Sequence, residues 1–246
     1  MLNKYEQVNV LGVDFTKITN NELLEQLKLD NQNHSNRFVI TANPEIVLYA
    51  RDHPEYLAVL KLADYTTADG IGIIKGAKIL KTPLPERVTG FDTLGSLLRF
   101  ANKEQKSVYF LGAKPETIKK TINKIHHDYP TLKIAGYHDG YFTNDQEIAT
   151  EIKDSQPDFV FVALGFPKQE FFIAKYRQLT PAIWMGVGGS FDVLAGTVKR
   201  APIFWQKHHI EWLYRLFQEP SRFWRMLALP KYLIMIYLKK FGLLKA

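Results

Sequence analysis

Residues 158–164 read Asp-Phe-Val-Phe-Val-Ala-Leu, a short apolar run followed at once by Gly165-Phe-Pro-Lys-Gln-Glu. Uninterrupted runs of this kind are typical of β-strands that are covered on both faces. Six other segments have a strand pattern, and helical patterns lie between most of them. The predicted strands are Val8–Phe15, Arg37–Ala42, Asp64–Ala68, Ser107–Leu111, Lys133–Tyr137, Asp158–Leu164 and Ala182–Met185.

The alternation of strands and helices predicts an α/β fold. We expect a Rossmann-like, mostly parallel sheet with helices on both faces, followed by a basic helical C-terminal appendage. Helix start signals support this prediction. Thr19-x-x-Glu22 and Thr143-x-x-Gln146 have the spacing of a capping box, and Asn43-Pro44 places an N-cap residue before a proline.

The positive charge of the chain is concentrated at its C-terminal end. The 246 residues carry a formal net charge of +7, whereas the segment from Lys199 onward has ten Lys or Arg and only two Glu. The first 198 residues are therefore nearly neutral. A basic protein can bind nucleic acid, but a neutral body with a basic tail does not favour that class, and we expect no nucleic-acid partner.

The tail differs from the body in composition. Pro202, Pro220 and Pro230 divide it into short pieces in which aromatic and aliphatic residues alternate with Lys and Arg. This pattern suits amphipathic helices on an anionic membrane surface, and it suits a helical hairpin packed on the body equally well. We expect residues 1–198 to form the α/β domain and residues 199–246 to form a basic amphipathic appendage, for which both interpretations stay open at this point.

Three sequence features concern the cellular compartment. Met1 begins a polar stretch without an apolar signal core, so we do not expect secretion. The most apolar run, Tyr232 to Leu238, is far shorter than the about 20 residues that cross a bilayer. The chain has no cysteine, which excludes disulfides and thiolate metal sites. These features predict neither a secreted nor a membrane-spanning protein.

Polar and glycine-rich segments follow most of the predicted strands, at the sheet edge where α/β proteins bind ligands. Asp69, before Gly70, is the candidate catalytic base, because a carboxylate there can reach a hydroxyl proton without being buried in the sheet. It could also cap the helix Ile71–Leu80, and the pattern alone favours that cap. Asn43 is open to the same interpretation, and Thr41 could be an ordinary strand residue.

Other segments suggest contacts with phosphate or ribose. Gly186-Val-Gly-Gly-Ser resembles a phosphate-binding turn, but it lacks the full dinucleotide fingerprint and the Walker lysine of a P-loop ATPase. Asp192 could bind a ribose hydroxyl or serve as a first-turn acid. Arg87 lies in a proline-rich loop and could bind phosphate or pair with a surface acid.

Several familiar active-site patterns are absent from the sequence. There is no Asp-x-Asp clamp for a metal-bound nucleotide sugar and no Gly-x-Ser-x-Gly elbow of an α/β hydrolase. His126-His127 and His208-His209 are adjacent pairs whose side chains diverge on a helix. We therefore expect no metal site and no cofactor.

Eight short segments at strand ends and in the tail form a set. They are Thr41-Ala-Asn-Pro-Glu-Ile-Val, Ala68-Asp-Gly-Ile-Gly, Glu86-Arg-Val-Thr-Gly-Phe-Asp, Phe110-Leu-Gly-Ala, Val162-Ala-Leu-Gly-Phe-Pro-Lys-Gln-Glu, Gly186-Val-Gly-Gly-Ser-Phe-Asp, Val198-Lys-Arg-Ala-Pro and Glu211-Trp-Leu-Tyr-Arg. In order and spacing this set resembles the WecG/TagA/CpsF glycosyltransferase family, most closely its TagA/TarA branch. The resemblance covers nearly the whole chain, and its specificity comes from the set rather than from any one segment.

The resemblance implies transfer of N-acetylmannosamine from a UDP-sugar donor to the 4-hydroxyl of N-acetylglucosamine on undecaprenyl diphosphate, in wall teichoic acid synthesis. It also implies inversion at the anomeric carbon and independence from metal, which agrees with the missing Asp-x-Asp. The family's catalytic Asp falls on Asp69, its active-site Thr and Asn on Thr41 and Asn43, and its pocket Arg and Gln on Arg87 and Gln169. The resemblance further implies that residues 1–198 are the catalytic domain and that residues 199–246 are a membrane-docking appendage. It thus implies a cytoplasmic enzyme that binds peripherally to the inner face of the plasma membrane.

The tail offers cations for the acceptor. Because arginine matches phosphate bidentately, we expect Arg215, Arg222 and Arg225 to bind the lipid-linked diphosphate. They could share one side of a helix, but Pro220 makes counting the helical phase across them unsafe.

Three alternatives stay open at this stage. The same family includes enzymes that use an N-acetylmannosaminuronic acid donor or build capsular lipids. A nicotinamide-dependent oxidoreductase would need a glycine fingerprint after the first strand, where only Gly12 is present. A non-catalytic peripheral membrane protein would leave the polar strand ends unexplained. The sequence does not determine the oligomeric state, and a homo-oligomer is one possible partner arrangement.

Overall fold

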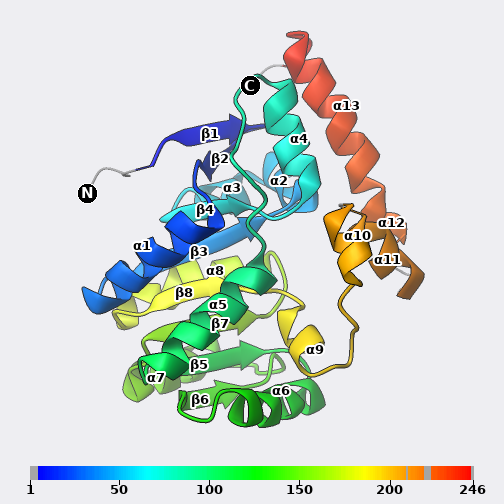
Figure 1. The fold of residues 1–246 in the computed structure, drawn as a ribbon. Helices are drawn as coiled ribbons and strands as arrows, with labels where there is room; N and C mark the ends of the chain where they lie inside the picture. Colours follow the sequence, from blue (N-terminus) through cyan, green and yellow to red (C-terminus); the bar gives the residue numbers. More distant parts are fainter. Residues whose placement is uncertain (1–4, 209, 219–222, 245–246) are drawn as a thin grey trace.

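The computed structural model describes residues 5–208, 210–218 and 223–244. At its centre lies a six-stranded sheet with the order β4-β3-β8-β7-β5-β6, in which every pair of neighbours is parallel (Figure 1). The predicted α/β fold is confirmed. The strands are β3 (Arg37–Ala42), β4 (Tyr65–Ala68), β5 (Ser107–Gly112), β6 (Lys133–His138), β7 (Phe159–Ala163) and β8 (Ile183–Gly186).

The apolar run near residue 160 forms a central strand, β7. Val160 and Val162 belong to the hydrophobic core on one face of the sheet, and Phe159 and Phe161 belong to the core on the other. Both faces of β7 are buried because successive side chains of a strand point in opposite directions.

Helices cover both faces of the sheet, as predicted. Helices α1, α5, α6 and α9 contribute to one core, and α2, α3, α4, α7 and α8 contribute to the other. These helices are α1 (Asn20–Gln32), α2 (Pro44–Asp52), α3 (Pro54–Leu60), α4 (Ile71–Ile79), α5 (Gly90–Lys103), α6 (Pro115–Asp128), α7 (Asp145–Ser155), α8 (Lys168–Tyr176), followed by a 3-10 turn (Arg177–Leu179), and α9 (Ser190–Leu194).

The predicted single strand Val8–Phe15 is wrong. The segment is a hairpin of β1 (Gln7–Val10) and β2 (Val13–Thr16), which forms a separate two-stranded antiparallel sheet. Leu11 and Gly12 both have positive φ, 53° and 96°, which is the geometry of a two-residue type I′ turn. The strand pattern continued across this turn because the turn contributes only two residues.

The predicted helix starts are mostly confirmed. Thr19 and Glu22 form the predicted capping box, and the Asn43 side chain accepts a hydrogen bond from the Ile46 N–H. The expected box at Thr143 is wrong by one residue, because Asn144 caps α7. Its side-chain oxygen satisfies two N–H groups of the first turn, so it is the better cap.

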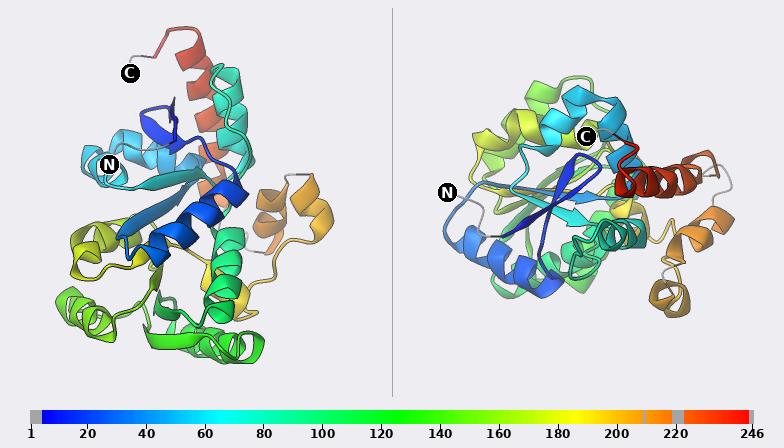
Figure 2. Two further views of the ribbon diagram at one scale, coloured as in Figure 1. Left: turned by 60° about the vertical axis from the view of Figure 1, so that its left-hand side comes forward. Right: turned by 90° about the horizontal axis from the view of Figure 1, so that it is seen from above.

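The last helix of the chain, α13 (Ala228–Lys240), lies along the body beside α2 and α4 (Figure 2). Tyr232 and Ile236 are fully buried in the core. Gly76 of α4 permits this close approach, because a Cβ there would collide with the Tyr232 hydroxyl. Pro230 lies at a break in the tail as predicted, since the preceding helix ends at Met226 and α13 begins at Ala228. It lies in the first turn of α13, where a missing N–H leaves no helical hydrogen bond unmade.

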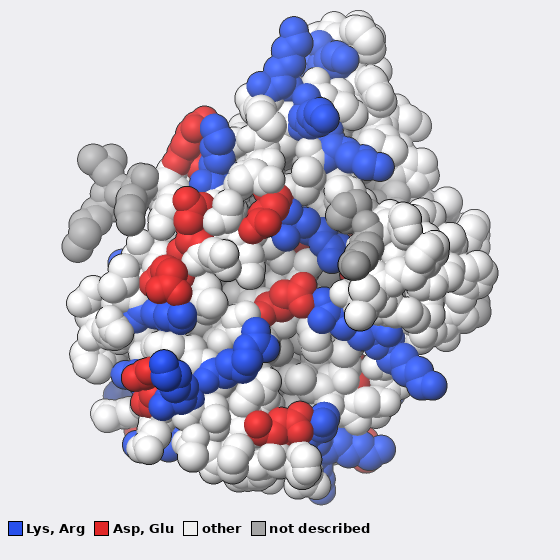
Figure 3. Space-filling model, in the orientation of Figure 1, with Lys and Arg blue, Asp and Glu red and all other residues white. Residues whose placement is uncertain are grey.

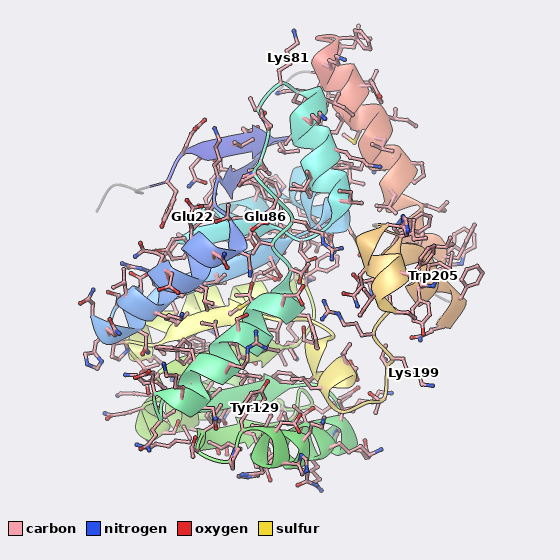
Figure 4. The ribbon with its side chains drawn as sticks, in the orientation of Figure 1. Glu22, Lys81, Glu86, Tyr129, Lys199 and Trp205 are labelled. Carbon is pink, nitrogen blue, oxygen red and sulfur yellow. The ribbon has the colours of Figure 1, made fainter. Side chains whose placement is uncertain are left out.

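The remaining described tail helices project from the body, as both views of Figure 2 show. They are α10 (Ile203–Lys207), α11 (Glu211–Gln218) and α12 (Phe223–Met226). Trp205 of α10 packs against Tyr214 and Phe217 of α11 (Figure 4). Pro202 precedes α10 as predicted, whereas Pro220 lies outside the described residues. None of the described helices has the length and apolar character needed to span a membrane.

Candidate active site

A cleft of about 830 Å³ opens at the carboxyl ends of the parallel strands. Loops after β3, β4, β5, β7 and β8 line one side of it, and the tail lines the other. The candidate residues from the sequence that line it are Thr41, Asn43, Asp69, Arg87, Gln169, Asp192 and Arg225. A smaller cavity of about 210 Å³, lined by residues of β2 and α3, contains none of them.

Asp69 is placed where β4 ends and the chain turns at Gly70, whose φ is 137°. Helix α4 has Gly70 at its N-cap position and no side-chain cap, so the interpretation of Asp69 as the cap of that helix is wrong. The Asp69 carboxylate instead accepts a hydrogen bond of 3.2 Å from the Gly90 N–H at the start of α5. The carboxylate therefore lies in the cleft, oriented by a neighbouring helix.

Thr41 and Asn43 approach Asp69 from β3. Thr41 is paired in register with Thr67 of β4, which places it near the strand end that carries Asp69. A Cβ at Gly90 would lie 2.9 Å from the Thr41 hydroxyl oxygen, so the missing side chain of Gly90 lets α5 begin against both strands. Asn43 lines the cleft while capping α2, and its two interpretations are therefore compatible.

Arg87 pairs with an acid from the tail. Its guanidinium lies 3.4 Å from the carboxylate of Glu211, at the start of α11, and both side chains are mostly buried. The adjacent Glu86 points the other way and accepts a hydrogen bond from the Asn20 N–H at the start of α1 (Figure 4). The loop between α4 and α5 thus joins the body to the tail across the cleft.

The glycine turn after β8 is supported from behind by Gln169. The side-chain oxygen of Gln169 accepts the Gly188 N–H at 3.1 Å, and Gly188 has a φ of 50°. Asp192 follows in the first turn of the short helix α9 and accepts a hydrogen bond of 3.4 Å from the Thr117 hydroxyl. Asp192 is thus a first-turn acid as predicted, and it lines the cleft, whereas binding of a ribose hydroxyl stays a prediction.

Of the three tail arginines, the structure describes only the Arg225 side chain. Its guanidinium binds both carboxylate oxygens of Glu45, at 2.8 and 3.0 Å, and lies above the ring of Phe166. Arg215 belongs to α11, and Arg222 lies outside the described residues. Arg225 thus meets the first turn of α2 at the rim of the cleft.

Comparison with known proteins gives matches that include both the sheet and the tail of this chain. The model of the glycosyl transferase WecG/TagA/CpsF family matches residues 8–246. The chain belongs to the WecG/TagA/CpsF family of glycosyltransferases. The family region therefore includes the basic tail as well as the sheet.

Curated relatives in this glycosyltransferase family share the name N-acetylglucosaminyldiphosphoundecaprenol N-acetyl-beta-D-mannosaminyltransferase. A relative from Bacillus spizizenii is 50% identical over 196 residues, 79% of this chain and 76% of its own. One from Bacillus subtilis is 43% identical over 80% of this chain and 78% of its own. One from Staphylococcus aureus is 37% identical over 98% of this chain and 96% of its own.

Several residues of the glycosyltransferase cleft were not among the predicted site residues. Lys114, directly before α6, lines the cleft and makes no ion pair with any residue that the structure describes. The rule that ligands bind at strand ends could have found it, since it follows β5. Glu45 and Glu211 were quoted within motifs but given no role, because their arginine partners are about 180 and 124 residues away.

Proposed function

We propose that this enzyme transfers N-acetylmannosamine from UDP-N-acetylmannosamine to the 4-hydroxyl of N-acetylglucosamine carried on undecaprenyl diphosphate. The observation that carries the proposal is the position of Asp69 in a cleft that also holds four cationic side chains. The names of the relatives supply the sugar and the acceptor. The cations are Arg87, Lys114, Arg200 and Arg225.

In the proposed reaction, the acceptor 4-oxygen forms a bond with the anomeric carbon while the bond from that carbon to UDP breaks. The Asp69 carboxylate takes the hydroxyl proton, and UDP leaves with the bonding electron pair. A base on the face opposite UDP makes the reaction inverting, through an oxocarbenium-like transition state. The Gly90 N–H orients the carboxylate, and Thr41 and Asn43 lie where they can contact a sugar.

Negative charge grows on the UDP phosphates as the bond breaks, and this proposed mechanism stabilises it without a metal ion. Lys114 has no acidic partner to release among the described residues, so it is the cation most directly available. Arg87 exchanges Glu211 for phosphate. Arg225 exchanges Glu45 for the diphosphate of the acceptor, together with Arg215 and Arg222.

The tail is the part of the enzyme that we assign to the membrane. Its described helices expose large apolar side chains, and the surface over α10 and α11 is largely free of charged groups (Figure 3). Flanking Lys and Arg would contact anionic headgroups. Residues 1–198 are then the catalytic domain and residues 199–246 the appendage that binds the inner face of the plasma membrane. The exposed side chains include Ile203, Phe204, Phe217, Phe223, Trp224 and Phe241.

A donor panel tests the proposed reaction. The protein is incubated with a short-chain N-acetylglucosamine diphospholipid, EDTA and one of three donors: UDP-N-acetylmannosamine, UDP-N-acetylglucosamine or the corresponding mannosaminuronic acid. Mass spectrometry of the lipid should show a disaccharide with the first donor only. If only the UDP-mannosaminuronic acid donor gave product, the enzyme would be assigned to another pathway of the family. No product from any donor, with membranes added, would contradict the proposal.

A further inference from the structure

A buried acid lies directly behind the glycine turn of the cleft. Glu170, in the first turn of α8, is 1% exposed, and Asp30, at 3%, is the only other buried acid among the residues that the structure describes. One Glu170 oxygen accepts a hydrogen bond of 2.7 Å from the side-chain nitrogen of Gln169. The other oxygen is buried and has no hydrogen-bond partner among the described residues. Burial raises the pKa of Glu170, although Gln169 and Tyr56 act in the opposite direction.

The hydrogen bonds of Gln169 fix the orientation of its amide. Its nitrogen donates to Glu170, and its oxygen accepts from the Gly188 N–H. A 180° flip would turn the amide nitrogen toward the Gly188 N–H and the amide oxygen toward a Glu170 oxygen, which would break both hydrogen bonds. Glu170 therefore determines which end of the amide meets the turn.

The amide is also held sterically. A Cβ on Gly186 would lie 2.7 Å from the Gln169 nitrogen, so the side chain packs closely on the end of β8. Gly188, Gly189 and Ser190 line the cleft, as Gln169 itself does. A change in the Gln169 amide would thus alter the backbone that forms this wall.

We propose that Glu170 is a positioning residue, which fixes the Gln169 amide and through it the Gly186–Ser190 wall against which the UDP-sugar donor binds. This inference rests on the proposed function for the identity of the donor. A leucine would fill the same space with a smaller desolvation cost, so packing alone does not explain an acid at this position. The acid supplies a hydrogen-bond acceptor that a leucine lacks.

The first test needs no substrate. In the ligand-free protein, we expect Glu170→Leu to shift the Gly188 backbone amide signal in nitrogen–proton NMR spectra and to speed its hydrogen exchange roughly tenfold. Glu170→Gln keeps an acceptor oxygen and should leave the Gly188 signal close to that of the wild type. Gln169→Met, which removes the amide and keeps Glu170, should reproduce the change seen in Glu170→Leu.

The second test uses the donor. Glu170→Leu should raise the KM for UDP-N-acetylmannosamine roughly tenfold with a smaller change in kcat, and Glu170→Gln should restore the wild-type KM. Asp30→Asn is the matched control, because Asp30 is buried but accepts hydrogen bonds from Tyr65 and Arg37 away from the cleft. It should lower the melting temperature and leave KM unchanged.

These measurements distinguish the positioning role of Glu170 from the proposed function of the enzyme. An unchanged Gly188 signal in folded Glu170→Leu would overturn the positioning role, whatever the activity. If Glu170→Leu fails to fold, an unchanged Gly188 signal in Gln169→Met would overturn it equally. A wild-type protein that turns over no UDP-sugar, in which Gly188 still responds to Glu170→Leu, would overturn the proposed function and support the link from Glu170 to the turn.

Discussion

The Arg87 guanidinium lies 3.4 Å from the Glu211 carboxylate, so a cation of the catalytic cleft is held by an acid of the tail. Only 17% of the Arg87 side chain and 14% of the Glu211 side chain are exposed. In the proposed function, a phosphate oxygen of the donor replaces this carboxylate on Arg87. The proposal therefore links donor binding to the position of α11, which carries Glu211.

Glu211→Gln tests this link. Because the neutral amide competes less for Arg87, we expect UDP to bind about two- to fivefold more tightly. We also expect a lower melting temperature, since the half-buried Arg87 loses its counter-charge. Isothermal titration and thermal unfolding measure the two effects. Weaker UDP binding in a folded variant would show that Glu211 supports the site rather than competing for it.

Gly90→Ala tests how the start of α5 positions the cleft residues. The new Cβ would lie 2.9 Å from the Thr41 hydroxyl oxygen, so the N–H that orients Asp69 must move. We expect kcat to fall roughly ten- to a hundredfold. Gly95→Ala in the same helix is the control, because its Cβ would meet nothing closer than 3.6 Å and should preserve activity. Equal activities of the two variants would contradict a role of Gly90 in positioning Asp69.

Trp224→Ser tests the assignment of the tail to the membrane. The Trp224 side chain is 76% exposed, and its loss should weaken binding to phosphatidylglycerol vesicles roughly tenfold. Tyr141→Ser is the matched control, since Tyr141 is 69% exposed but follows β6. Co-sedimentation with vesicles measures both. A loss of binding in the Tyr141 variant as large as in the Trp224 variant would contradict a specific role for the tail.

The raised pKa of Glu170 has a consequence for stability. An acid with a raised pKa in the folded state holds its proton more tightly there than in the unfolded chain. The contribution of Glu170 to stability is therefore greatest below the ordinary pKa of 4.5 and declines as pH rises through the interval up to the raised pKa. Because the Glu170→Gln side chain cannot ionise, the melting temperature of the variant should rise relative to that of the wild type as the pH increases from acidic to neutral. A difference that does not change with pH would contradict the raised pKa.

The sequence predicted the sheet well because its strands are locally distinctive. Residues 159–163 are apolar on both faces, and this pattern needs no information from other parts of the chain. The hairpin at Leu11 and Gly12 was missed because a two-residue turn barely interrupts a strand pattern. The cleft could be predicted from the rule on strand ends, which brought Thr41, Asn43 and Asp69 together.

The interactions of the tail could not be predicted in the same way. Arg225 and Glu45 are 180 residues apart, and nothing local to either one indicates the partner. Likewise, the short tail segments did not show that Tyr232 and Ile236 enter the core, because only the packing of α13 on α4 reveals which side of the helix is covered. Long-range packing determines both features.

The most direct test of the central claim is the rate of Asp69→Asn. The variant keeps the size of the side chain and an oxygen for the Gly90 N–H but cannot take up the proton of the acceptor hydroxyl. The control is Asp154→Asn, which changes an exposed acid on α7. With UDP-N-acetylmannosamine and the lipid acceptor, we predict that kcat falls roughly a hundredfold or more for Asp69→Asn and not for the control. Wild-type turnover by folded Asp69→Asn would contradict the assignment of Asp69 as the catalytic base.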